Sequence, residues 1–117
     1  MQRITNAGAE IAYLDEGDGE PVVLVHGFAS DHATNWVAPG WVGPLTAAGF
    51  RVVAPDMRGH GGSSRFYDPA DYALALMADD VAALIGALGA GAVPVAGYSM
   101  GAFIAATLAA ARPDLVS

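Results

Sequence analysis

The chain is 117 residues long and carries twelve acidic residues against five basic ones, which gives a formal net charge of −7. This length predicts one domain over residues 1–117 with no internal boundary. The acidic balance argues against nucleic acid and anionic membrane surfaces as partners. All five basic residues are arginines and cysteine is absent. These two facts exclude a phosphate-binding or Schiff-base lysine, thiol catalysis, disulfides and cysteine-ligated metals.

Hydrophobic residues make up 54% of the sequence and the mean hydropathy is +0.40, yet no apolar run is long enough to cross a bilayer. No basic segment leads into an apolar stretch at the start of the chain, so the sequence does not predict a secretory signal peptide. We therefore expect a cytoplasmic protein with no membrane partner, and the lack of cysteine suits that compartment.

The chain begins with the pattern of a β-hairpin. Residues 3–6 and 10–14 predict two short strands around the turn Ala7-Gly8-Ala9. An acidic segment at 15–21 predicts a solvated loop. Residues 22–25 follow as a continuous apolar run, which is typical of a strand buried on both faces.

Residues 29–43 lack a regular pattern and predict a loop. The two tryptophans of this loop, Trp36 and Trp41, either line a pocket or pin the loop to the core. The segment 44–48 has proline at its first position and Gly49 behind it, which predicts a brief helix.

Residues 51–54 predict another buried strand, and a glycine-rich turn follows at 58–64. This turn lacks the lysine spacing of a phosphate-binding loop. We expect its glycines to let the backbone pass close to a neighbouring loop, and Arg58 to pair with an acid or a carbonyl.

A longer helix is predicted from Asp68, with Pro69 at its first position, to the stop at Gly89. Asp79 and Asp80 fall outside its apolar stripe and are expected to be solvated. The stripe itself recurs at spacings of three and four and comprises Met77, Val81, Leu84, Ile85 and Leu88.

Residues 93–96 predict the last strand, and 100–112 predict a helix. The alternation of strands and helices indicates an α/β fold, with a mostly parallel sheet, flanking helices and a leading hairpin. In such sheets function gathers at the carboxyl ends of the strands. The inward face of the last helix is expected to comprise Phe103, Ile104, Thr107 and Leu108. The three strand ends expected at one edge are His26–Phe28, Asp56–Ser64 and Gly97–Met100.

The motif Gly-x-Ser-x-Gly at 97–101 lies between a β-branched strand and a helix. Gly97 and Gly101 leave room for a tight strand-to-helix turn, so Ser99 is expected to project from the bend as a nucleophile. The helix that begins beside it aims backbone N–H groups and a positive dipole end at whatever the hydroxyl attacks. An ordinary turn serine is the alternative interpretation.

Together with two further motifs, this one resembles the α/β-hydrolase superfamily, in its serine esterase and lipase-like branch. His26-Gly27-Phe28 is similar to the His-Gly turn after the third strand of that fold. The segment 56–63 resembles its D-x-R-G-x-G-x-S loop, and 97–101 resembles its nucleophile elbow. The resemblance implies an oxyanion hole formed by the backbone N–H groups of Phe28 and Met100. The side chains of Phe28, Tyr98 and Met100 suggest an apolar pocket floor, and the alternative is that such residues beside an elbow belong to the core.

The family's triad continues with an acid and a histidine after the serine, but this sequence holds only Asp114 and no histidine beyond Ser99. Asp114 is expected about 20 Å from Ser99, past the far end of the helix. His26 or His60 would have to stand in as a base, although each has a structural explanation within its motif, and His32 lies in an unplaced loop.

The sequence therefore resembles the first half of an α/β-hydrolase, and we expect activity to need a C-terminal half that supplies the acid and the histidine. The strand 93–96 would then have an unpaired edge, which predicts self-association or a companion chain. The expected function is serine-dependent hydrolysis of small-molecule carboxylic esters or related acyl substrates, without cofactor or metal. The alternatives are a non-catalytic binding or assembly module and a cofactor-free perhydrolase.

Overall fold

The structure is a computed structural model that describes all 117 residues. It opens with the predicted hairpin, in which β1 (Gln2–Asn6) pairs antiparallel with β2 (Ala9–Glu16) and Ile4 lies opposite Ile11. The turn between them places Ala7 and Gly8 at positive φ, 48° and 85°. The hairpin is confirmed, and β2 extends two residues beyond its predicted end.

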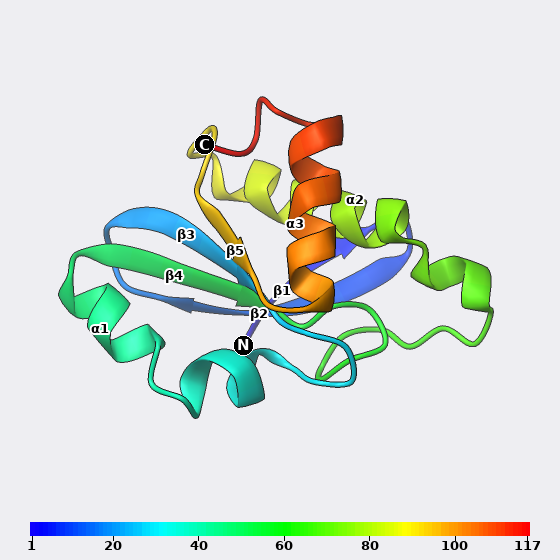
Figure 1. Cartoon of the computed structure of the whole chain (residues 1–117), viewed down its shortest axis with the longest axis horizontal. Helices are drawn as coiled ribbons and strands as arrows, with labels where there is room; N and C mark the ends of the chain where they lie inside the picture. Colours follow the sequence, from blue (N-terminus) through cyan, green and yellow to red (C-terminus); the bar gives the residue numbers. More distant parts are fainter.

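The remaining strands are β3 (Glu20–Val25), β4 (Phe50–Pro55) and β5 (Val95–Gly97). They complete a five-stranded sheet in the order β1-β2-β4-β3-β5 (Figure 1). The pairs β3–β4 and β3–β5 are parallel, whereas β2 pairs antiparallel with β4. The α/β fold is confirmed, with a mixed sheet in which the parallel strands form the half that carries the site.

Helices α2 (Leu74–Leu88) and α3 (Met100–Ala111) pack together on one face of the sheet (Figure 1). They bury the larger core, which includes Leu84, Ile85, Ile104 and Leu108 at 1% exposure or less. Gly89 ends α2 in the left-handed conformation, as its position predicts.

The long helix predicted from Asp68 is divided in two. A 3₁₀ turn, η2 (Pro69–Tyr72), begins where the carboxylate of Asp68 accepts a hydrogen bond from Ala70 N–H. Ala73 is then extended, with ψ of 141°, so the chain leaves the helical path before α2 starts.

The opposite face of the sheet carries η1 (Ala33–Val37) and α1 (Val42–Ala47). A helical turn therefore stands where the sequence predicted a loop, because Asp31 Oδ1 accepts a 2.7 Å hydrogen bond from Thr34 N–H and fixes its start. Helix α1 begins two residues earlier than predicted. A second core packs beneath these elements, formed by Leu24, Trp36, Val42, Val52 and Ala54.

Two predictions about helix faces were wrong. Phe103 is 67% exposed, because α3 buries only a narrow stripe containing Ile104 and Leu108 against α2 and the sheet. Asp80 is 1% exposed rather than solvated, because the face of α2 that carries it turns toward Arg58.

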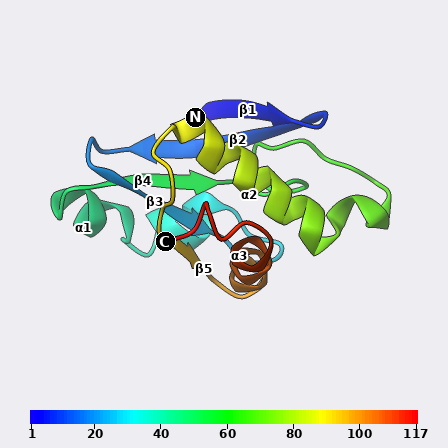
Figure 2. The same cartoon turned by 90° about the horizontal axis from the view of Figure 1, so that it is seen from above.

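Strand β5 lies at the edge of the sheet (Figure 2). Residues 115–117 pair only with Val93, two residues before β5: Val93 N–H donates to Leu115 O, and Ser117 N–H donates to Val93 O, both at 3.0 Å. This forms a single parallel bridge between Val93 and Val116. None of the helices combines the length and the apolar character that a bilayer crossing requires.

Candidate active site

The turn between β5 and α3 holds Ser99 in a conformation that residues with a side chain rarely adopt. Its φ is 55° and its ψ is −117°, and the residue is exposed. A Cβ on Gly97 would overlap the backbone of Gly101, and a Cβ on Gly101 would overlap the carbonyl of Val25. Both glycines are thus required by close backbone approach, and the strand reverses into the helix with the serine at the bend.

Three polar groups at or beside this bend have no partner within the protein. Ser99 Oγ makes no hydrogen bond, and Met100 N–H, the first donor of α3, also has none. Phe28 N–H is unpaired as well. An ideal Cβ on Gly27 would lie 3.4 Å from the Cβ of Ser99, so the turn after β3 runs directly beside the serine.

Phe28 and Met100 line one cavity of about 410 Å³. Its wall is mainly apolar, and the polar atoms of its two polar side chains are already engaged. Tyr72 Oη accepts from Phe66 N–H and donates to Phe66 O, and both ring nitrogens of His60 contact backbone groups. The other lining residues are Ala29, Gly59 and Met77.

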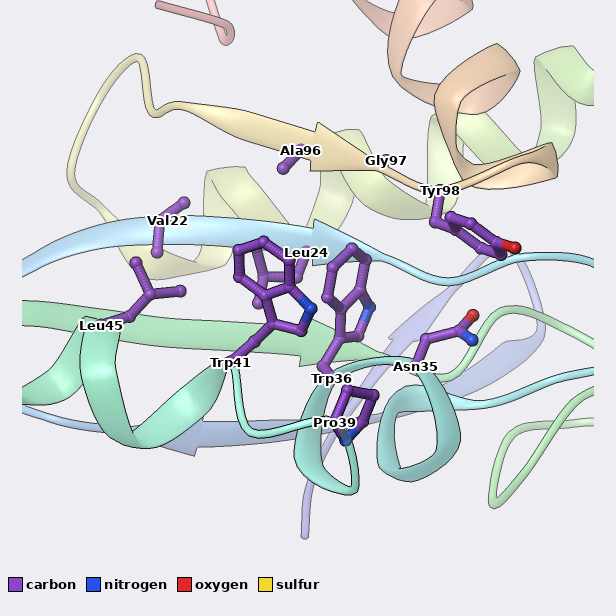
Figure 3. A pocket seen from close by; sticks show the side chains of 10 residues that line it. All are labelled: Val22, Leu24, Asn35, Trp36, Pro39, Trp41, Leu45, Ala96, Gly97 and Tyr98. Carbon is purple, nitrogen blue, oxygen red and sulfur yellow. The ribbon is translucent and has the colours of Figure 1, made fainter.

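Tyr98, the third expected lining residue, lies elsewhere. It borders a larger hollow of about 680 Å³ between β3, β5 and the η1–α1 segment. Figure 3 shows the indoles of Trp36 and Trp41 inside this hollow, with Asn35 and Tyr98 at one end. Trp36 is buried and its Nε1–H has no partner, whereas Trp41 is 55% exposed. Trp36 belongs to the second core and both tryptophans line the hollow, so pocket lining holds for both and pinning to the core for Trp36 alone.

None of the three histidines contacts Ser99 Oγ. His26 is fully buried, with Nδ1 2.7 Å from Gly27 O and Nε2 accepting from Met57 N–H at 2.9 Å. Burial lowers the pKa of its imidazole, so the neutral ring is favoured. His32 Nδ1 pairs with Asp56 Oδ1 at 2.8 Å. His26 and His60 use both ring nitrogens in structural contacts, which removes them as a base.

Asp56 organises the loop after β4. Its carboxylate accepts hydrogen bonds from His32 and from Gly62 N–H, and its backbone carbonyl accepts from Ser63 Oγ. Arg58 forms a buried bidentate pair with Asp80, at 2.7 and 2.9 Å, and also donates to the carbonyl of Asp71. The expected partners of Arg58, an acid and a carbonyl, are therefore both present.

Asp114 is exposed at the far end of α3, where Arg112 donates two hydrogen bonds to its carboxylate. That pairing holds the pKa of Asp114 below its usual value. No group of three or more histidine, cysteine or acidic side chains is arranged to hold a metal ion.

The sequence reasoning missed one residue beside the site. Asn35 Oδ1 accepts a 2.8 Å hydrogen bond from Gly27 N–H, across eight residues of chain. No local pattern marks this asparagine, since its role depends on how η1 folds back under β3. The contact of His60 with Ala29 N–H was also unforeseen, although His60 lies inside a motif.

Comparisons with known proteins agree with this fold. The family model described as alpha/beta hydrolase fold matches residues 20–117. A Mycobacterium tuberculosis protein named as a non-heme bromoperoxidase is 39% identical over 107 residues, which is 92% of this chain and 39% of the relative. The (E)-2-((N-methylformamido)methylene)succinate hydrolase of Acinetobacter baylyi is 35% identical over 106 residues, 89% of this chain and 37% of that protein.

Among solved structures, an epoxide hydrolase from Vigna radiata superposes with a TM-score of 0.91 at 28% identity, over 98% of this chain and 37% of the other. The mixed sheet, its flanking helices and its match to solved hydrolases define a fold of the α/β class. The chain belongs to the α/β-hydrolase fold family. It spans about two fifths of the length of the curated relatives it matches.

Proposed function

We propose that this chain is the nucleophile-bearing part of a serine hydrolase that acts on carboxylic esters or related acyl substrates. The observation that carries the proposal is an exposed, unpaired Ser99 hydroxyl on a strained turn beside two unpaired amides, Phe28 N–H and Met100 N–H. The serine in place of a carboxylate at the elbow favours acyl transfer over epoxide opening.

In this reaction Ser99 Oγ attacks the carbonyl carbon of the substrate and gives up its proton to a base. Negative charge develops on the carbonyl oxygen and is stabilised by the amides of Phe28 and Met100. One such donor contributes about 3 kcal/mol to lowering the barrier. The apolar wall formed by Phe28, Met77 and Met100 suits an uncharged acyl group.

The base has to come from outside residues 1–117, because no histidine here reaches Ser99. We propose that a polypeptide segment outside residues 1–117 supplies the acid and the histidine and docks on the open edge of β5. Backbone groups of Val93 already pair with residues 115–117 on this side. Alternate residues of a strand turn their backbone groups the same way, so Val95 and Gly97 offer the next free pairs.

The neighbouring hollow supports the same partner. Its apolar lining, with Trp41 and Tyr98 more than half exposed, leaves a large hydrophobic surface beside the open edge. The docking segment therefore has a strand parallel to β5 and apolar side chains that fill the hollow. Light scattering on a dilution series of residues 1–117 tests the open edge. We expect these residues alone to self-associate, and a stable monomer at low concentration would contradict the proposal.

Labelling with a fluorophosphonate probe tests the nucleophile. We expect labelling at Ser99 that disappears in Ser99→Ala, with folding of the variant checked by circular dichroism. We call residues 1–117 together with the docked segment that supplies the acid and the histidine the completed assembly. Absence of labelling in the completed assembly would favour a non-catalytic binding or assembly module instead.

A second candidate, cofactor-free perhydrolysis, is favoured by one observation: a relative 39% identical over 107 residues is named as a non-heme bromoperoxidase. Halogenation that depends on both peroxide and a carboxylic acid, and that is lost in Ser99→Ala, would single out this activity. Ester hydrolysis without halogenation would support the first proposal.

A further inference from the structure

The backbone on both sides of Phe28 is held by side chains from two distant segments. Gly27 N–H donates to Asn35 Oδ1 at 2.8 Å, and Ala29 N–H donates to His60 Nε2 at 3.0 Å. The amide between them, Phe28 N–H, has no partner in the protein. The peptide planes before and after the plane of Phe28 N–H are thus each held by a side chain, and Phe28 N–H is one of the two donors that the proposed reaction uses.

The contact with His60 requires one form of the ring. His60 Nδ1 lies 2.9 Å from Arg58 O, and a carbonyl oxygen only accepts, so Nδ1 carries the hydrogen. Nε2 then has a free lone pair, which is what accepts from Ala29 N–H. The ring is neutral in this arrangement, since a proton on Nε2 would face the amide hydrogen of Ala29.

Ala29 also needs this support because its backbone is strained. Its φ is 58°, one of three positive values among the non-glycine residues of the chain, and Ser99 is another. Such a conformation persists only when its surroundings hold it. Without an acceptor at His60 Nε2, Ala29 is free to relax to negative φ, and the peptide plane of Phe28 turns with it.

We infer that His60 and Asn35 are positioning residues that aim the Phe28 amide at the developing oxyanion, with His60 acting as the neutral Nδ1–H tautomer. This inference rests on the proposed serine chemistry for its consequence, but the hydrogen bonds themselves are independent of it. The rings of His60 and Phe28 pack edge to face, with their centroids 6.0 Å apart. Both ring nitrogens of His60 contact backbone groups and neither contacts Ser99, so His60 acts through the backbone.

A matched pair of substitutions separates this role from a general structural one. His60→Gln places an amide oxygen where Nε2 accepts from Ala29, whereas His60→Asn keeps a donor near Arg58 O and leaves Ala29 unpaired. We expect fluorophosphonate labelling of Ser99 in the completed assembly to slow by about 100-fold in His60→Asn and in Asn35→Leu. We expect His60→Gln to stay within about 10-fold of the parent, with unfolding midpoints of the two His60 variants alike.

Nitrogen-15 NMR of the chain itself supplies the second readout. We expect a scalar coupling across the hydrogen bond between the Ala29 amide nitrogen and His60 Nε2, and we expect it to be absent in His60→Asn. The equivalent coupling between the Met57 amide nitrogen and His26 Nε2 should be present in both proteins and serves as the internal control. A missing coupling in the parent chain, or equal labelling rates in His60→Asn and His60→Gln, would overturn the inference. A coupling that is present while Ser99 never labels would leave the hydrogen bond established and contradict the proposed hydrolase, along with the catalytic consequence drawn here.

Discussion

Two turns lie at the same edge of the sheet and differ in how their polar groups are used. In the turn after β4, Asp56, Arg58 and Ser63 are buried and their side chains are paired. In the turn after β5, Ser99 is exposed and neither its hydroxyl nor the amide of Met100 has a partner. The first turn therefore contributes stability, whereas the second keeps strained and unpaired groups available for a substrate.

The largest expected effect on stability comes from a substitution that disrupts the turn after β4. Asp80→Asn leaves the Arg58 guanidinium buried without its counter-ion, and we expect a loss of about 3–5 kcal/mol in the free energy of unfolding. Urea denaturation measures it. The neighbouring Asp79→Asn is the control, since that carboxylate is exposed and its contact is with Asn6, and it should change stability by less than about 0.5 kcal/mol.

The second prediction tests the close packing of the elbow. Gly101→Ala places a Cβ on the carbonyl of Val25, and we expect destabilisation by about 1–3 kcal/mol. Gly86→Ala introduces the same methyl group in open space inside α2, where alanine is the better helix former and stability should rise by up to about 1 kcal/mol. Thermal unfolding of the two variants should therefore shift in opposite directions, and shifts of the same sign would contradict the elbow geometry.

The third prediction measures the strain at Ser99. Ser99→Gly removes the Cβ that makes a φ of 55° unfavourable, so stability should rise by about 1 kcal/mol. Ser99→Ala keeps the Cβ and loses a hydroxyl that has no hydrogen bond, so it should be nearly neutral. If the two variants have equal unfolding free energies, the turn stores no strain.

The smallest expected effect is a dependence of folding stability on pH that comes from His26. His26 ties the end of β3 to the turn after β4, and its burial lowers its pKa below the ordinary value of 6.5. Between the lowered pKa of the folded chain and the ordinary pKa of the unfolded chain, only the unfolded chain binds a proton at His26. The contribution of His26 to stability is therefore complete above pH 6.5 and is lost as the pH falls below it. Denaturation curves collected at successive pH values should show this, and His26→Gln should flatten the dependence in that window.

Local patterns were sufficient for the strands and the elbow helix, but not for η1, for the break at Ala73 or for the exposed faces of the helices. The hairpin, the parallel strands and the elbow helix follow from periodicity and turn residues, which act over a few neighbours. Asp79 and Asp80 carry the same side chain in adjacent positions, yet only Asp80 is buried. The difference depends on where Arg58 lies, twenty-two residues away, and no helical periodicity contains that information.

The residues of the candidate site also differ in whether the sequence predicts their role. Ser99, Gly97 and Gly101 are marked by their spacing because the constraint on them is a local backbone turn. Asn35 has no such mark, since its side-chain oxygen Oδ1 accepts from Gly27 N–H only after η1 has folded beneath β3. The sequence predicts Tyr98 in one pocket with Phe28 and Met100, whereas in the structure Tyr98 lines the other hollow.

The amino-acid sequence by itself determined the α/β architecture, the serine at the bend and the two glycines that permit the bend, because each depends on backbone sterics within a few residues. Only the tertiary structure decided which polar groups are paired and which stay free. Pairing requires segments distant in the sequence to meet at hydrogen-bond distance, and that is settled by how the strands are ordered in the sheet and how the loops at their ends pack together.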